Sequence, residues 1–343
     1  MLKYNESISN ILFSCHGNDA SGIFLFIIFS LLFSLALDVI FGELPTRIHP
    51  VVIIGQLIDF FKNIFIKIEN RLSGLLTSFF VIVISCLIAF VILYIVSFNW
   101  ILFLIVFSIL LSSTFSIKML LSTAISVYDD LCESLDKARQ SVSYLVSRNT
   151  EELTEGFIVS ATIESLTENI TDSYIAPIFY FTIISVILLI INKNYLIFLL
   201  LVPLIYRIAN TMDAMLGYQT DELSDIGYIP AKLDDILNYI PARISGVIMV
   251  LAACLLGYDW KNGFKILKRD SRKCPSPNSG YTMATAAGVL NIQLIKKGTY
   301  ILGDNNKPID KDDIKKAVKL SKLTILLFTL IILIILILVH VIL

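Results

Sequence analysis

Six long apolar runs constrain the fold of this sequence more than any other feature. Most of them approach or exceed the roughly 20 residues that a transmembrane helix needs. The fifth run is short and contains Pro203, which favours a tilted or broken helix. The runs are Gly22–Phe41, Leu75–Ser97, Trp100–Leu121, Tyr174–Ile191, Tyr195–Ala209 and Leu323–Leu343. The sequence therefore predicts an all-α polytopic membrane protein with about six transmembrane helices.

The composition agrees with this fold class. Of the 343 residues, 56% are hydrophobic and 16% are charged, whereas about a quarter of the residues in soluble domains are charged. This excludes an ordinary soluble enzyme. A seventh apolar run, Ile244–Gly257, has 14 residues, and at this length a short or re-entrant segment competes with a true span. We expect residues 1–343 to form a single integral membrane domain.

The Lys and Arg residues are distributed unevenly among the connecting loops. If the six runs span the membrane, loops 42–74, 118–173, 207–243 and 258–322 lie on one side and hold 25 of the 27 Lys and Arg residues. The positive-inside rule places such loops in the cytoplasm. We therefore expect a multi-pass protein of the cell membrane in which the seventh run does not cross by itself. No nucleic-acid partner is expected.

Cysteine and histidine give little indication of chemistry. The five Cys occur singly, without the paired spacing of a disulfide framework or a zinc site, and the three His lie far apart. The first 21 residues lack a basic region and lead into a full-length apolar run. No cleavable signal peptide is therefore expected.

Local patterns predict shorter elements within the loops. Residues 126–147 have apolar side chains at helical spacing, and Asn149 followed by Glu152 has the pattern of an N-cap for the next helix. We expect a small-residue helix over Tyr281–Ile295, then a short strand-like "TYIL", and a helix that begins near Asp310. The segment 297–322 is interpreted as a connector with surface charges, and no chemistry is assigned to it.

Three carboxylates in the second large loop have a regular spacing. Glu164, Glu168 and Asp172 are placed at i, i+4 and i+8, so they share one face of a helix. Such a row is often a solvated face, but this one leads directly into the apolar run that begins at Tyr174. Oxygen-rich groups of this kind suit Mg²⁺ with a phosphate as co-ligand. The row is therefore a candidate metal site.

Two other loops also place polar residues beside apolar runs. Asp38 lies near the end of the first run, where a carboxylate is costly unless it is paired or hydrated. A helix-end carboxylate that reaches water, with a structural turn behind it, is the alternative. The third loop carries six carboxylates before Arg243, namely Asp213, Asp221, Glu222, Asp225, Asp234 and Asp235. We expect one or two of these carboxylates to bind metal, and the spacing leaves open which.

The stretch "RDSRKCPSPNSGYTMATAAG", residues 269–288, is charged and rich in turn residues within an apolar chain. It matches neither a Walker A loop nor a Rossmann fingerprint. Cationic side chains, backbone N–H groups and Asn278 can nevertheless cradle a phosphate. Anionic lipid is the alternative ligand, but attraction to lipid needs only cations and does not require the Pro-Ser-Pro-Asn-Ser-Gly turn. Phosphate binding accounts better for the whole stretch.

Six separated motifs resemble those of a known family. The segments "LD…GELP…HPV…IG", "VSRNT", "IESLTENITDSYIAPIFY", "NTMDAMLGY", "KLDDILNYIPARISG" and "RDSRKCPSPNSGYTMATAAGVLNIQL" occur in this order, roughly from residue 30 to residue 300. They resemble the motifs of adenosylcobinamide-phosphate synthase, a membrane protein family of cobalamin biosynthesis. The departures are modest, for example Asn149 where the family usually has Asp.

The resemblance implies a ligase reaction. Members of the family use ATP to join adenosylcobyric acid to aminopropanol or its O-phosphate through a carbon–nitrogen amide bond. Because an unactivated carboxylate must first be activated, ATP is expected as co-substrate and Mg²⁺ as cofactor. The expected site residues are Glu164, Glu168, Asp172 and Asp213 as catalytic groups; Glu164, Glu168, Asp172, Asp234 and Asp235 as metal ligands; Arg148, Arg243, Arg269, Arg272, Lys273, Ser276 and Asn278 as substrate or phosphate ligands; and Asp38, His49, Asn169 and Asn210 as further motif residues.

Two other functional classes stay open as alternatives. A corrinoid transporter would place its binding groups near the middle of the bilayer, often on broken helices, and Pro203 in the short fifth run favours it. A membrane scaffold for other corrin enzymes is the third class. We favour the enzyme because the ionisable clusters lie in loops on one side. The expected partners are the two substrates, the lipid bilayer and other membrane enzymes of the corrin pathway.

Overall fold

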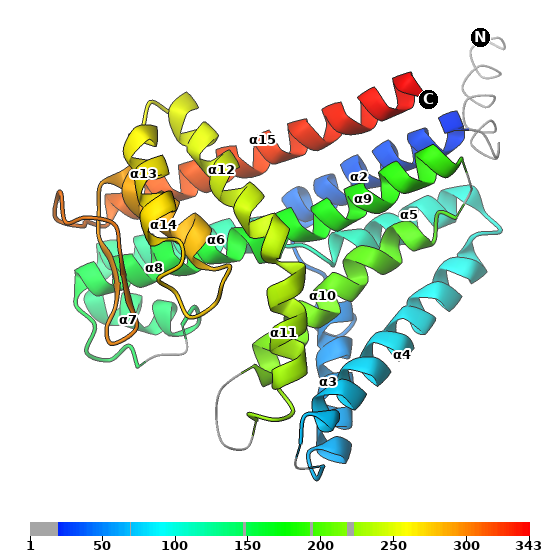
Figure 1. Cartoon of the computed structure of the whole chain (residues 1–343), viewed down its shortest axis with the longest axis horizontal. Coiled ribbons are helices and arrows are strands. Elements are labelled where there is room, and N and C mark those ends of the chain that lie inside the picture. Colours follow the sequence, from blue (N-terminus) through cyan, green and yellow to red (C-terminus); the bar gives the residue numbers. More distant parts are fainter. Residues whose placement is uncertain (1–19, 69, 147–148, 193–194, 218–222) are drawn as a thin grey trace. The chain divides into compact units, whose positions relative to one another are not determined.

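The computed structural model describes residues 20–68, 70–146, 149–192, 195–217 and 223–343. Helices dominate this part of the chain, which also contains a two-stranded antiparallel hairpin (Figure 1). The elements are α2 (Ala20–Phe41), α3 (Pro50–Phe65), α4 (Leu72–Val96), α5 (Trp100–Ser112), α6 (Ile117–Glu133), α7 (Leu135–Ser143), α8 (Glu155–Ile170), the π turn η1 (Thr171–Ile175), α9 (Ala176–Ile191), α10 (Phe198–Leu216), α11 (Tyr228–Leu237), α12 (Tyr239–Leu255), α13 (Trp260–Asp270), α14 (Gly280–Leu290), β1 (Leu294–Lys296), β2 (Tyr300–Leu302) and α15 (Asp312–Ile342).

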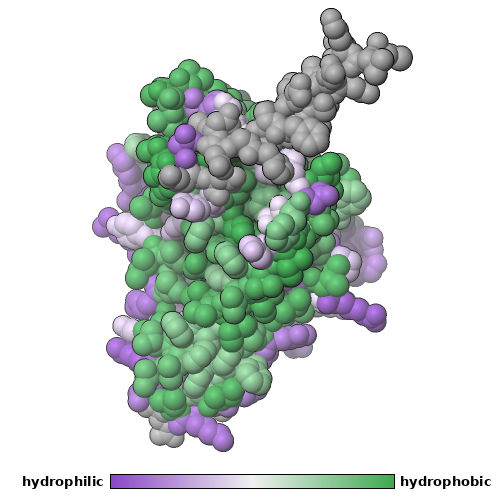
Figure 2. All heavy atoms as spheres, turned by 90° about the vertical axis from the view of Figure 1, so that its right-hand side faces the viewer, coloured by the Kyte–Doolittle hydropathy of each residue, from purple (hydrophilic) through white to green (hydrophobic). Residues whose placement is uncertain are grey.

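Six helical segments of the described chain are long and apolar enough to cross a membrane. They are Ser21–Phe41, Leu72–Val96, Trp100–Glu133, Glu155–Ile191, Phe198–Leu216 and Asp312–Ile342. Large apolar side chains are exposed along them, among them Phe79 and Leu87 of α4, and Figure 2 shows a largely apolar surface on the face that it draws. The prediction of an all-α polytopic membrane protein is confirmed.

Two of these segments are longer than the apolar runs that predicted them. Trp100–Glu133 has 34 residues and Glu155–Ile191 has 37 residues, whereas about 20 residues suffice to cross the hydrocarbon core. Several turns of each helix therefore extend beyond its apolar part. In Glu155–Ile191 the extension is α8, which carries the predicted row of carboxylates.

Helices α11 and α12 meet at a bend of 45°, and together they are long and apolar enough for one further broken span or a re-entrant segment. The sequence predicted a short segment from Ile244, but α12 already begins at Tyr239. Its proline, Pro241, lies in the first helical turn. Backbone N–H groups in this turn have no acceptor within the helix, so a proline, which lacks the N–H, costs no hydrogen bond there. Pro230 has the same place in α11. Both Ile-Pro steps therefore begin helices.

Two local predictions about helix ends were wrong. The predicted helix over 126–147 is interrupted within its described part, which ends at residue 146. Ser134 has an extended backbone, and its hydroxyl accepts a hydrogen bond from the Lys137 N–H, which starts α7. The N-cap of α8 is Thr154 and not Asn149. The Asn149 side chain instead accepts from the Glu151 N–H, which closes a local turn. In both cases a polar side chain, that of Ser134 or Asn149, accepts a hydrogen bond from a nearby backbone N–H. The spacing of apolar residues gives no sign of such a hydrogen bond.

The described chain divides into two compact units. Unit 1 comprises Met1–Ser116, Pro177–Asp234 and Leu330–Leu343, and unit 2 comprises Ile117–Ala176 and Asp235–Thr329. The single domain expected over the whole chain stays a prediction. In unit 1, the buried side chains of Ile58, Val81 and Ile208 join α3, α4 and α10 in one apolar cluster.

Unit 2 is built around α14, the expected small-residue helix, which packs against α13, α12 and α8 (Figure 1). A methyl group on Gly288 would lie 2.8 Å from the backbone oxygen of Asn262, so only glycine allows α13 and α14 to approach this closely. The helix ends at Leu290, followed by the hairpin, in which Lys296 pairs with Tyr300. The strand expected at "TYIL" is confirmed as β2.

Candidate functional site

A small polar cavity lies between helix α8 and the hairpin of unit 2. Its volume is about 140 Å³, and its polar lining comes from Glu164, Ser165, Glu168 and Asn169 of α8, Lys296 of β1 and Tyr300 of β2. The helical spacing of the sequence predicted that the two glutamates share a face. It gave no sign that a lysine and a tyrosine more than 120 residues later would complete the same cavity.

Glu164 connects α8 to the hairpin. Its buried carboxylate accepts hydrogen bonds from the Ser160 hydroxyl at 2.5 Å and from the Tyr300 hydroxyl at 2.9 Å. The Ser160 oxygen in turn accepts from the Ile295 N–H at 2.9 Å. Burial, together with the Glu164 carboxylate, raises the pKa of Tyr300 above its ordinary value. The tyrosine therefore stays protonated and remains a donor to Glu164.

Glu168 lies one helical turn after Glu164 and has a different environment. Within the described residues, no group donates a hydrogen bond to its carboxylate, and its electrostatic neighbours are Lys296 and Glu164. The Asn169 amide nitrogen donates to the Ser165 carbonyl at 2.8 Å. This orientation leaves the Asn169 amide oxygen as an acceptor. The cavity thus combines two carboxylates, an amide oxygen and one ammonium group.

Asp172 does not continue the row into the cavity. It lies in the π turn η1 and is absent from the residues that line the cavity. Pro177 follows this turn and has no N–H for the Ser173 carbonyl, which accounts for the local change of helix type. Among the residues that the structure describes, no three His, Cys, Asp or Glu side chains are grouped so that they can hold a metal ion.

A second polar cluster of unit 2 gathers four of the predicted ligands. The Arg243 guanidinium donates to the Asn278 side chain at 2.7 Å and lies over the rings of Tyr239 and Tyr281, at 3.6 and 4.3 Å from their centroids. Asn278 donates to the Asp235 carbonyl at 2.8 Å. The Ser276 hydroxyl lies 3.5 Å from the Asp235 carboxylate. We call Asp235, Arg243, Ser276 and Asn278 the Arg243 cluster.

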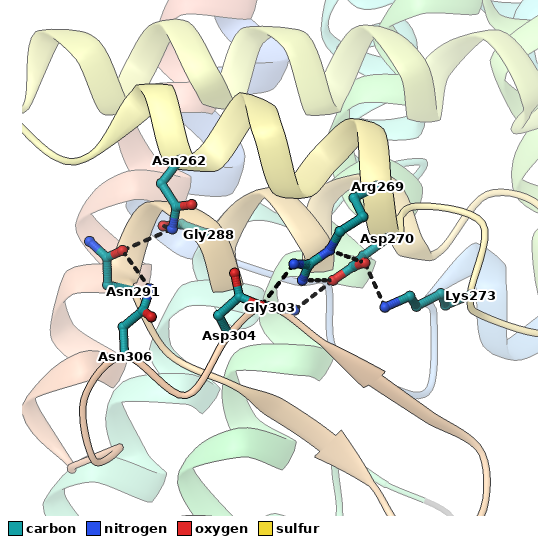
Figure 3. A network of polar contacts seen from close by, with 9 residues as sticks. All are labelled: Asn262, Arg269, Asp270, Lys273, Gly288, Asn291, Gly303, Asp304 and Asn306. Carbon is teal, nitrogen blue, oxygen red and sulfur yellow. Dashed lines mark hydrogen bonds and ion pairs between the residues drawn. The ribbon is translucent and has the colours of Figure 1, made fainter.

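Two of the cations predicted to bind phosphate are already paired. Figure 3 shows Arg269 and Lys273 converging on the fully buried Asp270. Both Asp270 oxygens accept from Arg269 at 2.7 Å, and Lys273 lies 2.6 Å away. Asp304 pairs with the same guanidinium at 2.8 Å. Arg272, by contrast, is exposed and forms no ion pair within the described residues.

Asp270 also holds the end of the hairpin. It accepts a hydrogen bond from the Gly303 N–H at 2.9 Å, and Gly303 has a φ of +79°, which favours glycine. Burial alone would raise the pKa of Asp270, but the hydrogen bonds from Arg269, Lys273 and Gly303 outweigh it and lower this pKa to about 2. Arg269 therefore acts on the hairpin through Asp270, a role that the sequence did not reveal.

Unit 1 has a polar cluster of its own near the start of α3. His49 is buried, and its Nδ1 accepts from the Val51 N–H at 3.2 Å as the N-cap of α3. Burial lowers the pKa of His49; Glu43 opposes this shift, and Arg207 adds to it. The Arg207 Nε is buried and has no hydrogen-bond partner among the described residues. The imidazole is therefore neutral near pH 7.

The other predicted residues of unit 1 lie on α2, α10 and α11. Asp38 is buried near the end of α2. Asn210 donates to the Asp234 carboxylate at 3.3 Å and accepts from Arg207 at 3.3 Å. Asp213 lies in the last turn of α10, with its carboxylate beside Gly217. Arg148 lies outside the described residues.

The sequence matches a known family over most of its length. Residues 31–321 match the family described as CobD/Cbib protein. The chain belongs to the CobD/Cbib protein family. This match confirms the resemblance seen in the motifs. The matched residues include the cavity lining and the Arg243 cluster of unit 2, and the polar cluster near His49 of unit 1.

Several relatives of this CobD/Cbib family member have names that refer to cobalamin. The chain is 47% identical to the probable cobalamin biosynthesis protein CobD of Methanothermobacter thermautotrophicus, over 87% of this chain and 94% of the relative. It is 37% identical to the probable protein of the same name from Methanocaldococcus jannaschii, over 87% and 94%. It is 35% identical to the cobalamin biosynthesis protein CobD of Leptospira interrogans, over 84% and 89%. No solved structure matches the chain.

Cys274 lies near the cavity, and its thiol is expected to be unreactive in this CobD/Cbib family member. Burial raises the pKa of Cys274 to about 11, with Glu164 and Glu168 adding to the shift. At pH 8 the thiolate is then about one part in a thousand, and the thiolate is the reactive form. We expect iodoacetamide to label exposed Cys132 at least ~100-fold faster than Cys274. Mass spectrometry of a time course measures both rates, and equal rates would contradict this expectation.

Proposed function

We propose that this chain acts in cobalamin biosynthesis as an ATP-dependent ligase, which joins adenosylcobyric acid to aminopropanol or aminopropanol O-phosphate. The names of the relatives support the pathway. The observation that most supports a reaction concerns the family motifs, which are far apart in sequence. They supply four of the six polar residues of the cavity and all four residues of the Arg243 cluster.

The proposed reaction needs two steps. In the first, an oxygen of the corrinoid carboxylate attacks the terminal phosphorus of ATP, and ADP leaves. In the second, the amine nitrogen attacks the activated carbonyl carbon, the C–O bond breaks, phosphate leaves with the electron pair, and the nitrogen gives up a proton. Such a sequence requires groups that bind phosphate, groups that hold a small amine and a carboxylate that can take a proton.

Within this proposal the Arg243 cluster binds phosphate groups. The Arg243 guanidinium is fixed by Asn278 and by two tyrosine rings, so it keeps a defined orientation for an anion. Asp235 fits Mg²⁺ that arrives with the nucleotide, because Mg²⁺ is usually held by one or two carboxylates plus phosphates. When bound, Mg²⁺ would neutralise charge on the phosphates. Arg272 is a further candidate for phosphate, because its charge has no ion-pair partner in the described chain.

We also propose that the basic loops face the cytoplasm of a cell membrane. The basis is the positive-inside rule, because loops 42–74, 118–173, 207–243 and 258–322 hold 25 of the 27 cationic residues. Labelling of Cys132 in intact cells with a membrane-impermeant thiol reagent measures the orientation of the loops. Labelling from outside the cell would show that the basic loops face outward.

The reaction is tested with the protein purified in detergent. It is incubated with adenosylcobyric acid, ATP, Mg²⁺ and either aminopropanol or its O-phosphate, and mass spectrometry measures the amide product. We expect product only with ATP, and at least ~100-fold less with Arg243→Ala, because a fixed phosphate ligand is lost. Lys261→Ala on α13, an exposed cation, is the matched control. If neither amine gives product, the ligase proposal fails and corrinoid transport becomes the leading alternative.

A further inference from the structure

The cavity beside α8 is lined by more carboxyl groups than cationic groups. Its lining contains the carboxylates of Glu164 and Glu168 but a single ammonium group, that of Lys296. Glu164 is satisfied by the hydroxyls of Ser160 and Tyr300. Glu168 receives no hydrogen bond from the described residues. A largely enclosed carboxylate without donors is costly, so the cavity calls for a ligand that is a cation and a hydrogen-bond donor.

The same groups do not fit a bare magnesium ion. Magnesium prefers near-octahedral oxygen ligands, but Glu164 already accepts two hydrogen bonds and Asp172 does not line the cavity. Lys296 adds a positive charge at the cavity, which repels a divalent cation about twice as strongly as a monovalent ammonium group at the same distance. The prediction that Glu164 and Glu168 bind magnesium therefore does not fit the arrangement of groups in the cavity.

An organic ammonium fits these groups. A primary ammonium has three N–H donors, and the cavity offers it the Glu168 carboxylate and the Asn169 amide oxygen, since the Asn169 nitrogen is engaged with Ser165. At about 140 Å³ the cavity is close in volume to an engineered cavity of about 150 Å³ that holds one benzene molecule. It therefore admits a molecule of about six heavy atoms and excludes a nucleotide or a corrin ring.

We propose that this cavity binds the small primary amine that the reaction consumes, with its ammonium group held by Glu168 and Asn169. Lys296, whose charge also acts on Glu168, lines the same cavity and is the cationic group available to a hydroxyl of the ligand. A phosphate on that hydroxyl exceeds the volume of the cavity and would extend out of it. The assignment rests on the proposed ligase function for the identity of the amine. It separates the amine, on α8 and the hairpin, from the phosphate groups at the Arg243 cluster.

Binding is measured by isothermal titration of the detergent-purified full chain, without nucleotide or corrinoid. The probes are aminopropanol, its O-phosphate and propanediol, which replaces the ammonium by a hydroxyl. We expect aminopropanol to bind at least ~100-fold more tightly than propanediol, because only the ammonium brings a charge to Glu168. Glu168→Gln is expected to weaken amine binding by ~10- to 100-fold. Lys296→Met is expected to weaken the O-phosphate more than aminopropanol.

Glu155→Gln is the matched control, since Glu155 is exposed on the same helix, and it should bind the amine like the wild type. Each variant is used after its melting temperature has been shown to match that of the wild type. Equal affinity for aminopropanol and propanediol, unchanged amine binding by Glu168→Gln, or displacement of the amine by Mg²⁺ alone would each overturn the amine site.

The outcomes also distinguish this site from the proposed function. If the wild type makes the amide while Glu168→Gln leaves the KM for the amine unchanged, the amine site is wrong and the ligase stands. If the wild type binds aminopropanol through Glu168 but makes no amide with either amine, the ligase is wrong and the ammonium site stands.

Discussion

Replacing Asp270 by alanine is expected to lower the free energy of unfolding by about 3 kcal/mol and to loosen the hairpin. Removal of one partner from a buried ion pair leaves the other charges uncompensated, which typically costs 3–5 kcal/mol. Here Arg269 and Lys273 are partly exposed, at 40% and 48% of their side chains, so water offsets part of the loss. The Gly303 N–H also loses its acceptor. Thermal melting in detergent measures the change.

Asp136→Ala is the matched control for this loss. Asp136 pairs with Arg139 at the surface, and its side chain is 90% exposed, so the expected change is below about 0.5 kcal/mol. Hydrogen exchange adds a local readout, because the amides of β2 should lose protection in Asp270→Ala. A variant with wild-type melting and wild-type exchange at Gly303 would contradict the role given to Asp270.

The stabilisation from Asp270 should also depend on pH. Its pKa is lowered to about 2 in the folded chain, against about 3.9 in an unfolded chain. The unfolded state therefore takes up a proton first as the pH falls, and the stabilisation present above pH ~4 is lost between pH ~4 and pH ~2. Asp270→Asn should lack this component. The melting temperatures of the two proteins should converge as the pH is lowered.

The large features of the fold were accessible from the sequence because they depend on local composition. Runs of apolar residues fixed the six candidate spans, and helical spacing placed Glu164 and Glu168 on one face. The turn residues after Asp270 also indicated the start of the small-residue helix α14. These signals act within a few residues, so each can be recognised without knowledge of the tertiary structure.

The rest of the candidate site depends on contacts between distant segments. Tyr300 reaches Glu164 across 136 residues, and nothing in "KKGTYIL" distinguishes these positions from a surface connector. The basic stretch was misleading in a different way, because Asp270 stands between its cations and pairs with two of them. A lone acidic residue within a basic stretch was the available signal. Pro177 was the local signal for the π turn η1, but a proline after a helix does not show that Asp172 is absent from the cavity lining.

Glu164→Ala is expected to reduce amide formation by at least ~100-fold and to destabilise the chain by about 3 kcal/mol. The substitution leaves the hydroxyls of Ser160 and Tyr300 without their acceptor, and each buried unsatisfied group costs about 1–3 kcal/mol. The Ile295 N–H depends on Ser160, so β1 loses its contact with α8 as well. Activity falls because Lys296 and Tyr300 then lose their fixed positions at the cavity.

Glu164→Gln separates the charge of this side chain from its role in positioning the hairpin. Glutamine keeps one acceptor oxygen, so melting temperature and hydrogen exchange at Ile295 should recover most of the wild-type values. If activity recovers with them, Glu164 is a positioning residue and its charge is dispensable. If the hairpin recovers while activity stays low, the carboxylate charge itself is needed at the cavity. An alanine variant that melts like the wild type and keeps the Ile295 amide protected would show that Glu164 does not hold the hairpin.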